Sequence, residues 1–238
     1  EKALDAWAEN KMALTNKGDV LRVMNRNEEA LACYDKAIKI NPNDANAWSD
    51  KGNIEIKLGR NIEAEESLDR ALEIDEWHEE AFLNKAELKA RQDNISGAKG
   101  ILDMLLERDK TFSNAWDAKA RLFKKLKKYD EALECSDMAI RYTSEDQTWS
   151  DSEGGYVGLW LNNKADILMG KAEDDTSNGV KILEEALEIS NEAIKKTPKR
   201  GICHYTKGQI LEKLGRNEEA KEYFEKAKER GYKSQKDD

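Results

Sequence analysis

A lysine followed by glycine or alanine recurs six times along the chain at a nearly constant interval. The first four pairs start 34 residues apart, and the last two arrive 11 and 9 residues later than this interval requires. The six lysines are Lys17, Lys51, Lys85, Lys119, Lys164 and Lys207. A fixed period of this length is typical of stacked repeat units, each of which contacts only its neighbours. We therefore expect one elongated array with a long surface, and no central active-site cleft.

Two further columns of small residues keep the same interval. The second column is Ala30, Ala64, Ala98, Ala132, Ala186 and Ala220. The third column is Ala37, Ala71, Leu105, Ala139, Ala193 and Ala227. Small residues are needed where helix axes pass about 8–10 Å apart, because larger side chains do not fit at the crossing. The columns therefore predict pairs of closely packed helices.

The stretch after Trp48 shows how one repeat is built. Apolar and small residues follow Trp48 at three-to-four spacing, as on one face of a helix. Gly59 then supplies a residue that tolerates positive φ, and Asn61 is a candidate N-cap for a second helix over 63–74. In the first repeat Asn25 replaces this glycine. Each repeat is thus predicted to be a helix, a tight turn and a helix.

Further positions give the pattern a family resemblance. Trp48, Phe82 and Trp116 stand four residues before the small residue of the first column, and Pro42 and Pro198 follow the third column by five residues. This pattern resembles the tetratricopeptide repeat over nearly all of residues 11–234. The resemblance implies an all-α fold, a right-handed α-α superhelix (solenoid) of about twelve main helices in helix-turn-helix repeats.

The sequence also departs from this family at defined positions. Ser136 and Ser190 stand where the family usually has an aromatic residue. The six lysines occupy a position that the family more often gives to leucine. We interpret them as long apolar stems that lie across the helices and end in solvated ammonium groups.

The repeat boundaries divide the chain into five parts. Residues 1–10 align with the end of a second helix and are predicted to be the tail of an upstream repeat, so that the chain is a fragment of a longer array. Repeats one to four occupy 11–146, and an insertion loop follows at 147–157. Repeat five, at 158–200, holds a second insertion at 171–179. Repeat six and a C-terminal tail occupy 201–238.

The two insertions have two possible roles. Part of the inserted length is expected to lengthen the helix pair of repeat five, and the rest is expected to form an acidic loop. Such a loop is either a tolerated surface insertion or a lip on the groove that contacts a partner.

Charge and composition argue against several partners. The net charge of −9 disfavours nucleic acid, because phosphate binding needs a clustered positive field. No run approaches the ~18 apolar residues of a membrane span, so a membrane partner is not expected. Cys33, Cys135 and Cys203 are widely spaced and odd in number, as in packed, reduced thiols of a cytoplasmic protein.

The pattern also argues against an enzyme. Neither His78 nor His204 has a cysteine or carboxylate at metal-ligand spacing, and no phosphate-binding loop or nucleophile with its base is recognisable. His204 stands where other repeats have Trp48 or Phe82, which predicts a packing role. No metal, cofactor or catalytic activity is expected.

The resemblance implies a binding surface instead. In this family the first helix of each pair lines a concave groove, through residues two before the small residue, one after it and one turn beyond. Asparagines at one such position can offer both a donor and an acceptor to an extended peptide, although asparagine is also common there in the family. The predicted groove residues are Asn16, Asp19, Ser49, Asp50, Asn53, Leu83, Asn84, Glu87, Asp117, Arg121, Lys124, Lys125, Asn162, Asn163, Asp166, Tyr205 and Gln209.

One known binding mode of the family is not expected. Chaperone-binding members hold a C-terminal carboxylate with cationic side chains and two asparagines from three consecutive repeats. Asn53 and Asn84 match the asparagines, but Ser49, Asn114 and Ala118 stand where the cations belong. A carboxylate clamp is therefore excluded by the missing positive charges.

The sequence thus predicts a non-enzymatic scaffold that binds an extended peptide or a helix of a protein partner in the groove. Two alternatives stay open. The chain is either the substrate-recognition arm of a multidomain enzyme such as a protein glycosyltransferase, or a module that associates end to end through uncapped ends.

Five bases within eight residues of the fourth repeat form a basic island in an otherwise acidic groove. They are Arg121, Lys124, Lys125, Lys127 and Lys128. The island predicts attraction of one acidic residue of the ligand. The alternative is a solvated helix end whose cations interact favourably with the helix dipole.

Overall fold

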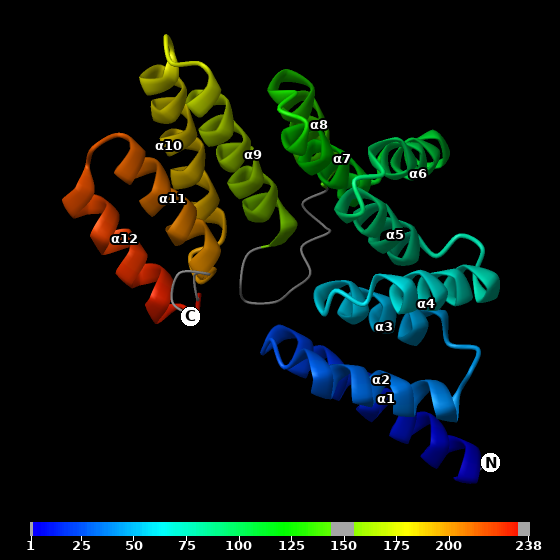
Figure 1. Cartoon of the computed structure of the whole chain (residues 1–238). Helices are drawn as coiled ribbons and strands as arrows, with labels where there is room; N and C mark the ends of the chain where they lie inside the picture. Colours follow the sequence, from blue (N-terminus) through cyan, green and yellow to red (C-terminus); the bar gives the residue numbers. More distant parts are fainter. Residues whose placement is uncertain (1, 144–154, 233–238) are drawn as a thin grey trace. The chain divides into compact units, whose positions relative to one another are not determined.

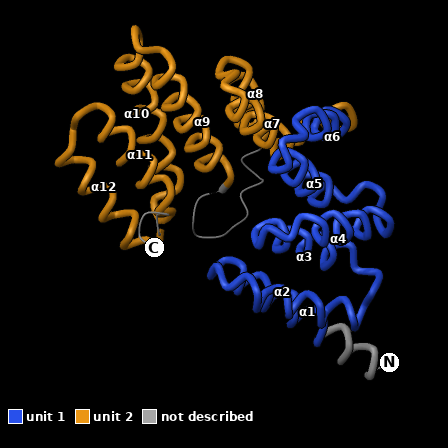
Figure 2. The backbone as a smooth tube through the Cα atoms, viewed as in Figure 1, with its two compact units in different colours: residues 1–105 blue, residues 106–238 orange. Residues whose placement is uncertain are grey.

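The computed structural model describes residues 2–143 and 155–232, and within them all regular structure is helical (Figure 1). These residues form twelve helices, which confirms the predicted all-α repeat fold. The chain divides into two compact units, residues 1–105 and 106–238, called the N-terminal and C-terminal units below (Figure 2). Each unit is described by itself.

The helices follow one another without other elements between them. The N-terminal unit holds α1 (Lys2–Val23), α2 (Asn27–Ile40), α3 (Ala45–Lys57), α4 (Asn61–Ile74), α5 (Glu79–Arg91) and most of α6 (Ile95–Arg108). The C-terminal unit holds α7 (Ser113–Lys125), α8 (Tyr129–Tyr142), α9 (Gly155–Asp174), α10 (Gly179–Lys196), α11 (Gly201–Lys213) and α12 (Asn217–Glu229).

Helix packing in each unit follows the order of the chain. Consecutive helices pair within a repeat, as α1 does with α2 and α7 with α8. The second helix of one repeat then packs on the first helix of the next, as α2 does on α3 and α8 on α9. First helices of neighbouring repeats also touch, since α3 contacts α5 and α9 contacts both α7 and α11.

The first-column glycines are required by close helix contacts. A Cβ atom placed on any of three of these glycines would lie only 2.6–2.8 Å from a large side chain of the second helix. The three pairs are Gly18 with Tyr34, Gly52 with Leu68, and Gly208 with Phe224. The second-column alanines are at most 1% exposed. Both observations confirm that the small residues stand where helices cross.

The two serines that depart from the family lie at the same helix crossings. In the fourth and fifth repeats the first column has Ala120 and Ala165, and the position that Tyr34 occupies in the first repeat holds a serine. Ser136 and Ser190 are both fully buried. In the third repeat Ala86 is combined with the large, buried Leu102, so an alanine in the first column does not by itself require a serine.

The tight turns also follow the prediction. Gly59 and Asn25 adopt positive φ angles of 74° and 59°. The backbone N–H of Arg60 donates to the carbonyl of Glu55 at 2.9 Å, which closes α3 with a left-handed turn residue. The predicted N-cap at Asn61 is off by one residue, because α4 already begins there and Arg60 holds the cap position without a side-chain hydrogen bond.

The start of the chain differs from the repeat pattern. Residues 1–10 were predicted as the tail of a separate upstream helix, but α1 runs without interruption from Lys2 through Val23. The stretch Trp7–Asn10 contains neither proline nor glycine. The corresponding junctions in later repeats are interrupted by Pro42 or by Asp75. The junctions at 75–78 and 109–112 also lack proline and glycine and still separate two helices, so these residue types alone do not account for the continuous α1.

The second insertion lengthens a helix pair, as expected. Helices α9 and α10 have 20 and 18 residues, whereas α7 and α8 have 13 and 14. Residues 171–174 extend α9, and Asp175 then accepts hydrogen bonds from Ser177 and Asn178 in the turn. Residues 144–154, which hold most of the predicted loop at 147–157, lie outside the described residues, and 155–157 begin α9.

The repeated lysines join neighbouring repeats through ion pairs. Lys51 Nζ lies 2.9 Å from Asp35, and Lys164 Nζ lies 2.5 Å from Asp137, in each case on the second helix of the preceding repeat. Lys85 pairs with Asp69 in the same way. The prediction of solvated ammonium groups was therefore incomplete, because these lysine ends are neutralised by a regularly spaced aspartate.

Candidate functional site

Three predicted groove residues of the N-terminal unit form a chain of amide contacts between α3 and α5. Asn53 Nδ2 donates to Asn84 Oδ1 at 2.8 Å, and Asn84 Nδ2 donates to Ser49 Oγ at 3.3 Å. The asparagines thus use part of their hydrogen-bonding capacity on each other. Asn53 Oδ1 is shielded from solvent and has no partner within the described residues. This oxygen is an acceptor that the fold leaves unsatisfied.

Two predicted carboxylates of the same unit lie together between α1 and α3. Tyr34 Oη donates to Asp19 Oδ1 at 2.8 Å, and Arg22 Nη2 lies 3.5 Å from the same oxygen. Burial and the neighbouring charge of Asp19 raise the pKa of Asp50 to about 7. Burial, Asp50 and Asp19 also raise the pKa of Tyr34, so that its phenol stays protonated as a donor.

Asp50, unlike Asp19, has no direct bonding partner in the described part of the chain. The structure gives its carboxylate neither a hydrogen bond nor an ion pair among the residues described, and Arg22 opposes its raised pKa only through a longer-range interaction. We define the N-terminal groove face as the surface formed by Asp19, Ser49, Asp50, Asn53 and Asn84.

The other predicted residues of this unit are less involved. Asn16 is exposed on α1, and Leu83 is half-buried on α5. Glu87 pairs with Arg91 at 2.8 Å on its own helix. These three side chains do not take part in the contacts that define the N-terminal groove face.

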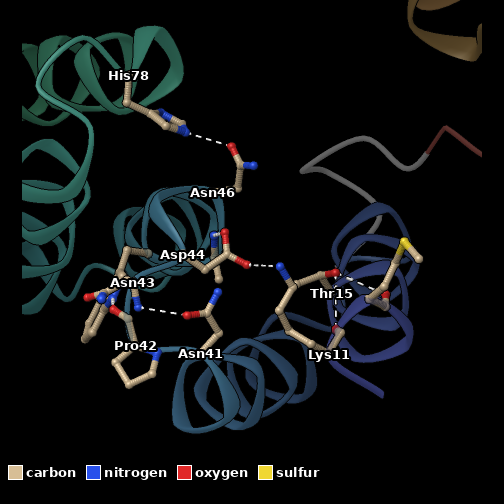
Figure 3. A network of polar contacts seen from close by, with 11 residues as sticks. Lys11, Thr15, Asn41, Pro42, Asn43, Asp44, Asn46 and His78 are labelled. Carbon is tan, nitrogen blue, oxygen red and sulfur yellow. Dashed lines mark hydrogen bonds and ion pairs between the residues drawn. The ribbon is translucent and has the colours of Figure 1, made fainter. Parts of the chain in front are cut away.

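A polar network links α1 to the N-terminal ends of α3 and α5 (Figure 3). Lys11 of α1 pairs with Asp44 at 2.6 Å, and Asp44 caps α3. His78 caps α5, since its Nδ1 accepts from the backbone N–H of Ala81 at 3.2 Å. His78 Nε2 therefore carries the proton and donates to Asn46 Oδ1 of α3 at 2.8 Å. The network fixes α1, α3 and α5 relative to one another.

In the C-terminal unit the predicted residues converge on a buried carboxylate. Asp117 is only 2% exposed. It accepts hydrogen bonds from Arg121 Nε at 3.0 Å and from Asn163 Nδ2 at 2.8 Å. Burial raises the pKa of Asp117, and the charge of Arg121 and the bond from Asn163 oppose this change. Asn163 thus repeats the role of Asn84, donating to the first helix of the preceding repeat.

Most bases of the predicted basic island form ion pairs with carboxylates of the same chain. Arg121 pairs with Asp117, Lys124 with Asp166, Lys127 with Asp174 at 3.0 Å, and Lys128 with Glu131 at 3.5 Å. An acidic ligand would have to compete with these carboxylates. The charge pattern of the sequence therefore overstated the positive field of this helix.

Removing Arg121 should expose the dependence of Asp117 on its partner. We expect Arg121→Ala to lower the free energy of unfolding by about 1–3 kcal/mol near neutral pH, because a buried carboxylate loses its cation. The loss should disappear below about pH 4, where the carboxyl is protonated in both folded and unfolded chains. Urea unfolding at several pH values measures this difference.

Lys128→Ala is the matched control, because it removes an exposed cation from the same turn region. Its effect should be within about 0.5 kcal/mol at every pH. Equal losses in the two variants would contradict the role given to Asp117.

The remaining predicted residues of the C-terminal unit divide between packing and the groove. Tyr205 packs against Phe224 and Tyr232, with ring centroids 5.4 Å and 4.6 Å away. Asn162 is 4% exposed, and its Oδ1 has no partner in the part of the chain that the structure describes. Gln209 is half-buried on α11.

The contacts of both histidines indicate structural roles. His204 is 4% exposed, and its Nε2 lies 2.9 Å from the carbonyl oxygen of Pro198. Trp48 makes the same contact, since its Nε1 donates to the carbonyl of Pro42 at 2.9 Å. The predicted packing role of His204 is thus confirmed. Among the described residues, no group of histidine, cysteine and carboxylate side chains could hold a metal ion.

Two residues that contact Asp19 in the N-terminal unit were missed by sequence reasoning. Arg22 stands one turn beyond Gly18, so the third groove position, applied to the first repeat, would have found it. Tyr34 belongs to a second helix, where the pattern indicated packing alone. Its ring does pack on Gly18, but its hydroxyl reaches Asp19.

Paired helices at a constant repeat, with polar residues aligned along the first helices, define a helical repeat protein. Sequence profiles of the tetratricopeptide repeat match residues 18–54, 55–122, 113–146 and 203–230. The chain belongs to the tetratricopeptide repeat family. A comparison with curated protein sequences gave no significant match.

Several solved structures share the fold. A tetratricopeptide repeat protein from Parabacteroides merdae is 21% identical, with 94% of this chain and 80% of that chain covered and a TM-score of 0.68. Yeast Tom70 is 19% identical over 88% of this chain and 41% of its own, with a TM-score of 0.69. Pseudomonas aeruginosa pilF is 15% identical over 92% of this chain and 90% of its own, with a TM-score of 0.58.

Membership of this family supports a protein-interaction scaffold in general terms, whereas at such identities the structural similarity shows the fold alone. No helix of the described residues is long and apolar enough to cross a membrane.

Proposed function

We propose that the protein is a non-enzymatic scaffold that binds an extended peptide segment of a partner protein along its first helices. The observation that carries this proposal is the unsatisfied acceptor in the groove set of each unit. Asn53 Oδ1 and Asn162 Oδ1 are both shielded from solvent without a partner among the described residues. A buried carbonyl oxygen without a hydrogen bond costs about 1–3 kcal/mol, so a bound state in which the asparagine turns and accepts from a ligand donor is favoured.

An extended backbone suits these positions better than a small molecule does. Its N–H groups recur at regular intervals, and each asparagine can accept from one of them whatever the peptide sequence. The amide chain from Ser49 through Asn84 to Asn53 fixes the orientation of the free oxygen. Binding must turn the Asn53 side chain outward, because the oxygen is shielded from solvent in the free protein.

The thiols favour a reducing compartment as the place of action. Cys33, Cys135 and Cys203 are buried and form no disulfide. Such thiols are typical of cytoplasmic proteins, which supports the proposed cytoplasmic location.

The test begins with a random peptide display library selected on the intact protein. The strongest binder is synthesised, and its affinity is measured by calorimetry. Asn53→Ala or Asn162→Ala should weaken it about tenfold, equivalent to one hydrogen bond of about 1.4 kcal/mol. Which variant responds shows which unit holds the peptide.

Asn191→Ala is the matched control, because Asn191 is an exposed asparagine of the second helix α10. It should leave the affinity unchanged. Failure of the library to yield any binder, or a binder that tolerates both Asn53→Ala and Asn162→Ala, would rule the proposal out.

A further inference from the structure

We infer that the N-terminal groove face selects a basic residue of the bound peptide, with a lysine or arginine side chain placed beside Asp19 and Asp50. This inference rests on the proposed function and adds to it the chemical class of the ligand. It concerns the N-terminal unit alone.

The repeat itself shows that a positive charge is missing here. The residue after the first-column position of one repeat faces the residue two before that position in the next, as Asn53 faces Asn84 at 2.8 Å. One repeat earlier, the same two positions hold Asp19 and Asp50. An amide pair supplies one donor and one acceptor, whereas two carboxylates supply acceptors only. The two amides therefore bond to each other directly, whereas two ionised carboxylates at the same positions cannot.

The charged groups around Asp50 do not supply that donor in full. Arg22 of α1 reaches Asp19 at 3.5 Å, and Tyr34 of α2 also donates to Asp19. Glu80 of α5 and Asp44, which precedes α3, both act on Asp50 with the same sign as Asp19. Asp44 is itself paired, since Lys11 lies 2.6 Å away.

Two cations, Arg22 and Lys11, thus lie among four carboxylates, and among the described residues Asp50 and the exposed Glu80 stay without a direct partner. An ammonium or guanidinium group brought by a ligand would complete the pairing. Charged hydrogen bonds of this kind are shorter and stronger than neutral ones.

A second acceptor lies beside Asp50 on the same helix. Asn53 follows Asp50 by three residues on α3, so the two side chains are neighbours on one helix face. Asn53 Oδ1 has no partner among the described residues and is held in place by the bond to Asn84. Arginine offers several N–H donors in a fixed fork, which suits a carboxylate and an amide oxygen side by side.

The C-terminal unit provides the contrast. There the groove carboxylates Asp117 and Asp166 are already paired with Arg121 and Lys124. A ligand cation would gain little from carboxylates that have internal partners. Charge complementarity therefore assigns the basic residue to the N-terminal unit and not to the C-terminal one.

The cluster also makes binding dependent on pH. The pKa of Asp50 is raised to about 7, so this carboxyl is partly protonated near neutral pH. A cation binds the ionised form and releases the proton. The affinity for a basic peptide should therefore rise about tenfold between about pH 6 and pH 8, and this rise should be absent in Asp50→Asn.

The experiment uses the peptide selected on the intact protein. Its basic residue is replaced by citrulline for arginine or by norleucine for lysine, which keeps the shape and removes the charge. We expect about a tenfold loss or more with the wild-type protein and a much smaller loss with Asp50→Asn, because the charge pair is then already absent. Calorimetry at several pH values measures both effects.

Glu66→Gln is the control, because it removes one exposed negative charge from α4 of the same unit. It should change neither the affinity nor its pH dependence. The folded state of Asp50→Asn is checked by thermal unfolding, and it should be at least as stable as the wild type.

The outcomes separate the inference from the proposed function. If peptides bind and depend on Asn53 but show no preference for a basic residue, the inference fails while the scaffold stands. If the selected peptides carry a basic residue whose removal weakens the wild type and Asp50→Asn equally, the inference also fails, since the charge then acts elsewhere. If no peptide binds, the proposed function fails and the inference with it.

Discussion

Gly52→Leu is expected to lower the free energy of unfolding by about 3 kcal/mol, at the upper end of the range for overpacked cores. The reason is geometric. Even a Cβ atom at Gly52 would lie 2.8 Å from Cγ and Cδ2 of Leu68, and this contact has no space to relax into because Leu68 is fully buried. A whole leucine side chain would force α3 and α4 apart.

The damage should also be local. In a stacked array each repeat is stabilised by its neighbours. The substitution should therefore accelerate amide exchange most in α3 and α4 and change it little in α11 and α12. Hydrogen exchange resolved by peptide measures this gradient, and uniform acceleration along the chain would contradict it. Gly100→Leu is the control, because a Cβ atom there meets no other atom within 4 Å. That variant should be neutral or more stable by about 0.5–1 kcal/mol, since glycine disfavours helix.

Asp50→Asn is expected to stabilise the folded protein, and the gain should depend on pH. The pKa of Asp50 rises from 3.8 to about 7 on folding, so ionisation of this group opposes folding. The opposition is absent below about pH 4, grows between the two values and is complete above about pH 7. The gain at about pH 8 should be about 1–4 kcal/mol, the upper figure being the unscreened limit.

Urea unfolding of wild type and variant across this pH range provides the measurement. Glu66→Gln should show no comparable trend, because its side chain is exposed on α4. A gain that is the same at about pH 4 and pH 8 would show that Asp50 is not strained by its charge.

The helical part of the fold could be predicted because it depends on local rules. The 34-residue columns predicted the helix pairs, and the positive φ at Gly59 and Asn25 followed from residue type alone. The boundary at residues 1–10 was placed from the alignment of columns alone, and this alignment did not show that α1 runs through it.

The positions of the groove residues could be predicted, but most of their hydrogen bonds and ion pairs could not, because these depend on which side chains meet across repeats. The column spacing located Asn53 and Asn84, but not that they bond to each other. The pairing of Arg121 with Asp117 could have been found from their four-residue spacing on one helix. Lys124 and Asp166 are 42 residues apart across the insertion, so the spacing of the earlier repeats did not indicate their contact.

The same aspartate–lysine ion pair recurs between successive repeats, so one repeat can take the place of another without losing this pair. Asp35 meets Lys51 as Asp69 meets Lys85, with the same sixteen-residue step along the chain. If residues 45–78 were deleted, Asp35 would face Lys85 and the same attraction would close the new junction. A gene that loses or duplicates one such segment therefore still encodes matching surfaces. The last repeat lies outside this exchange, because Asn191 replaces the aspartate and Lys207 turns to the Tyr223 hydroxyl at 2.7 Å.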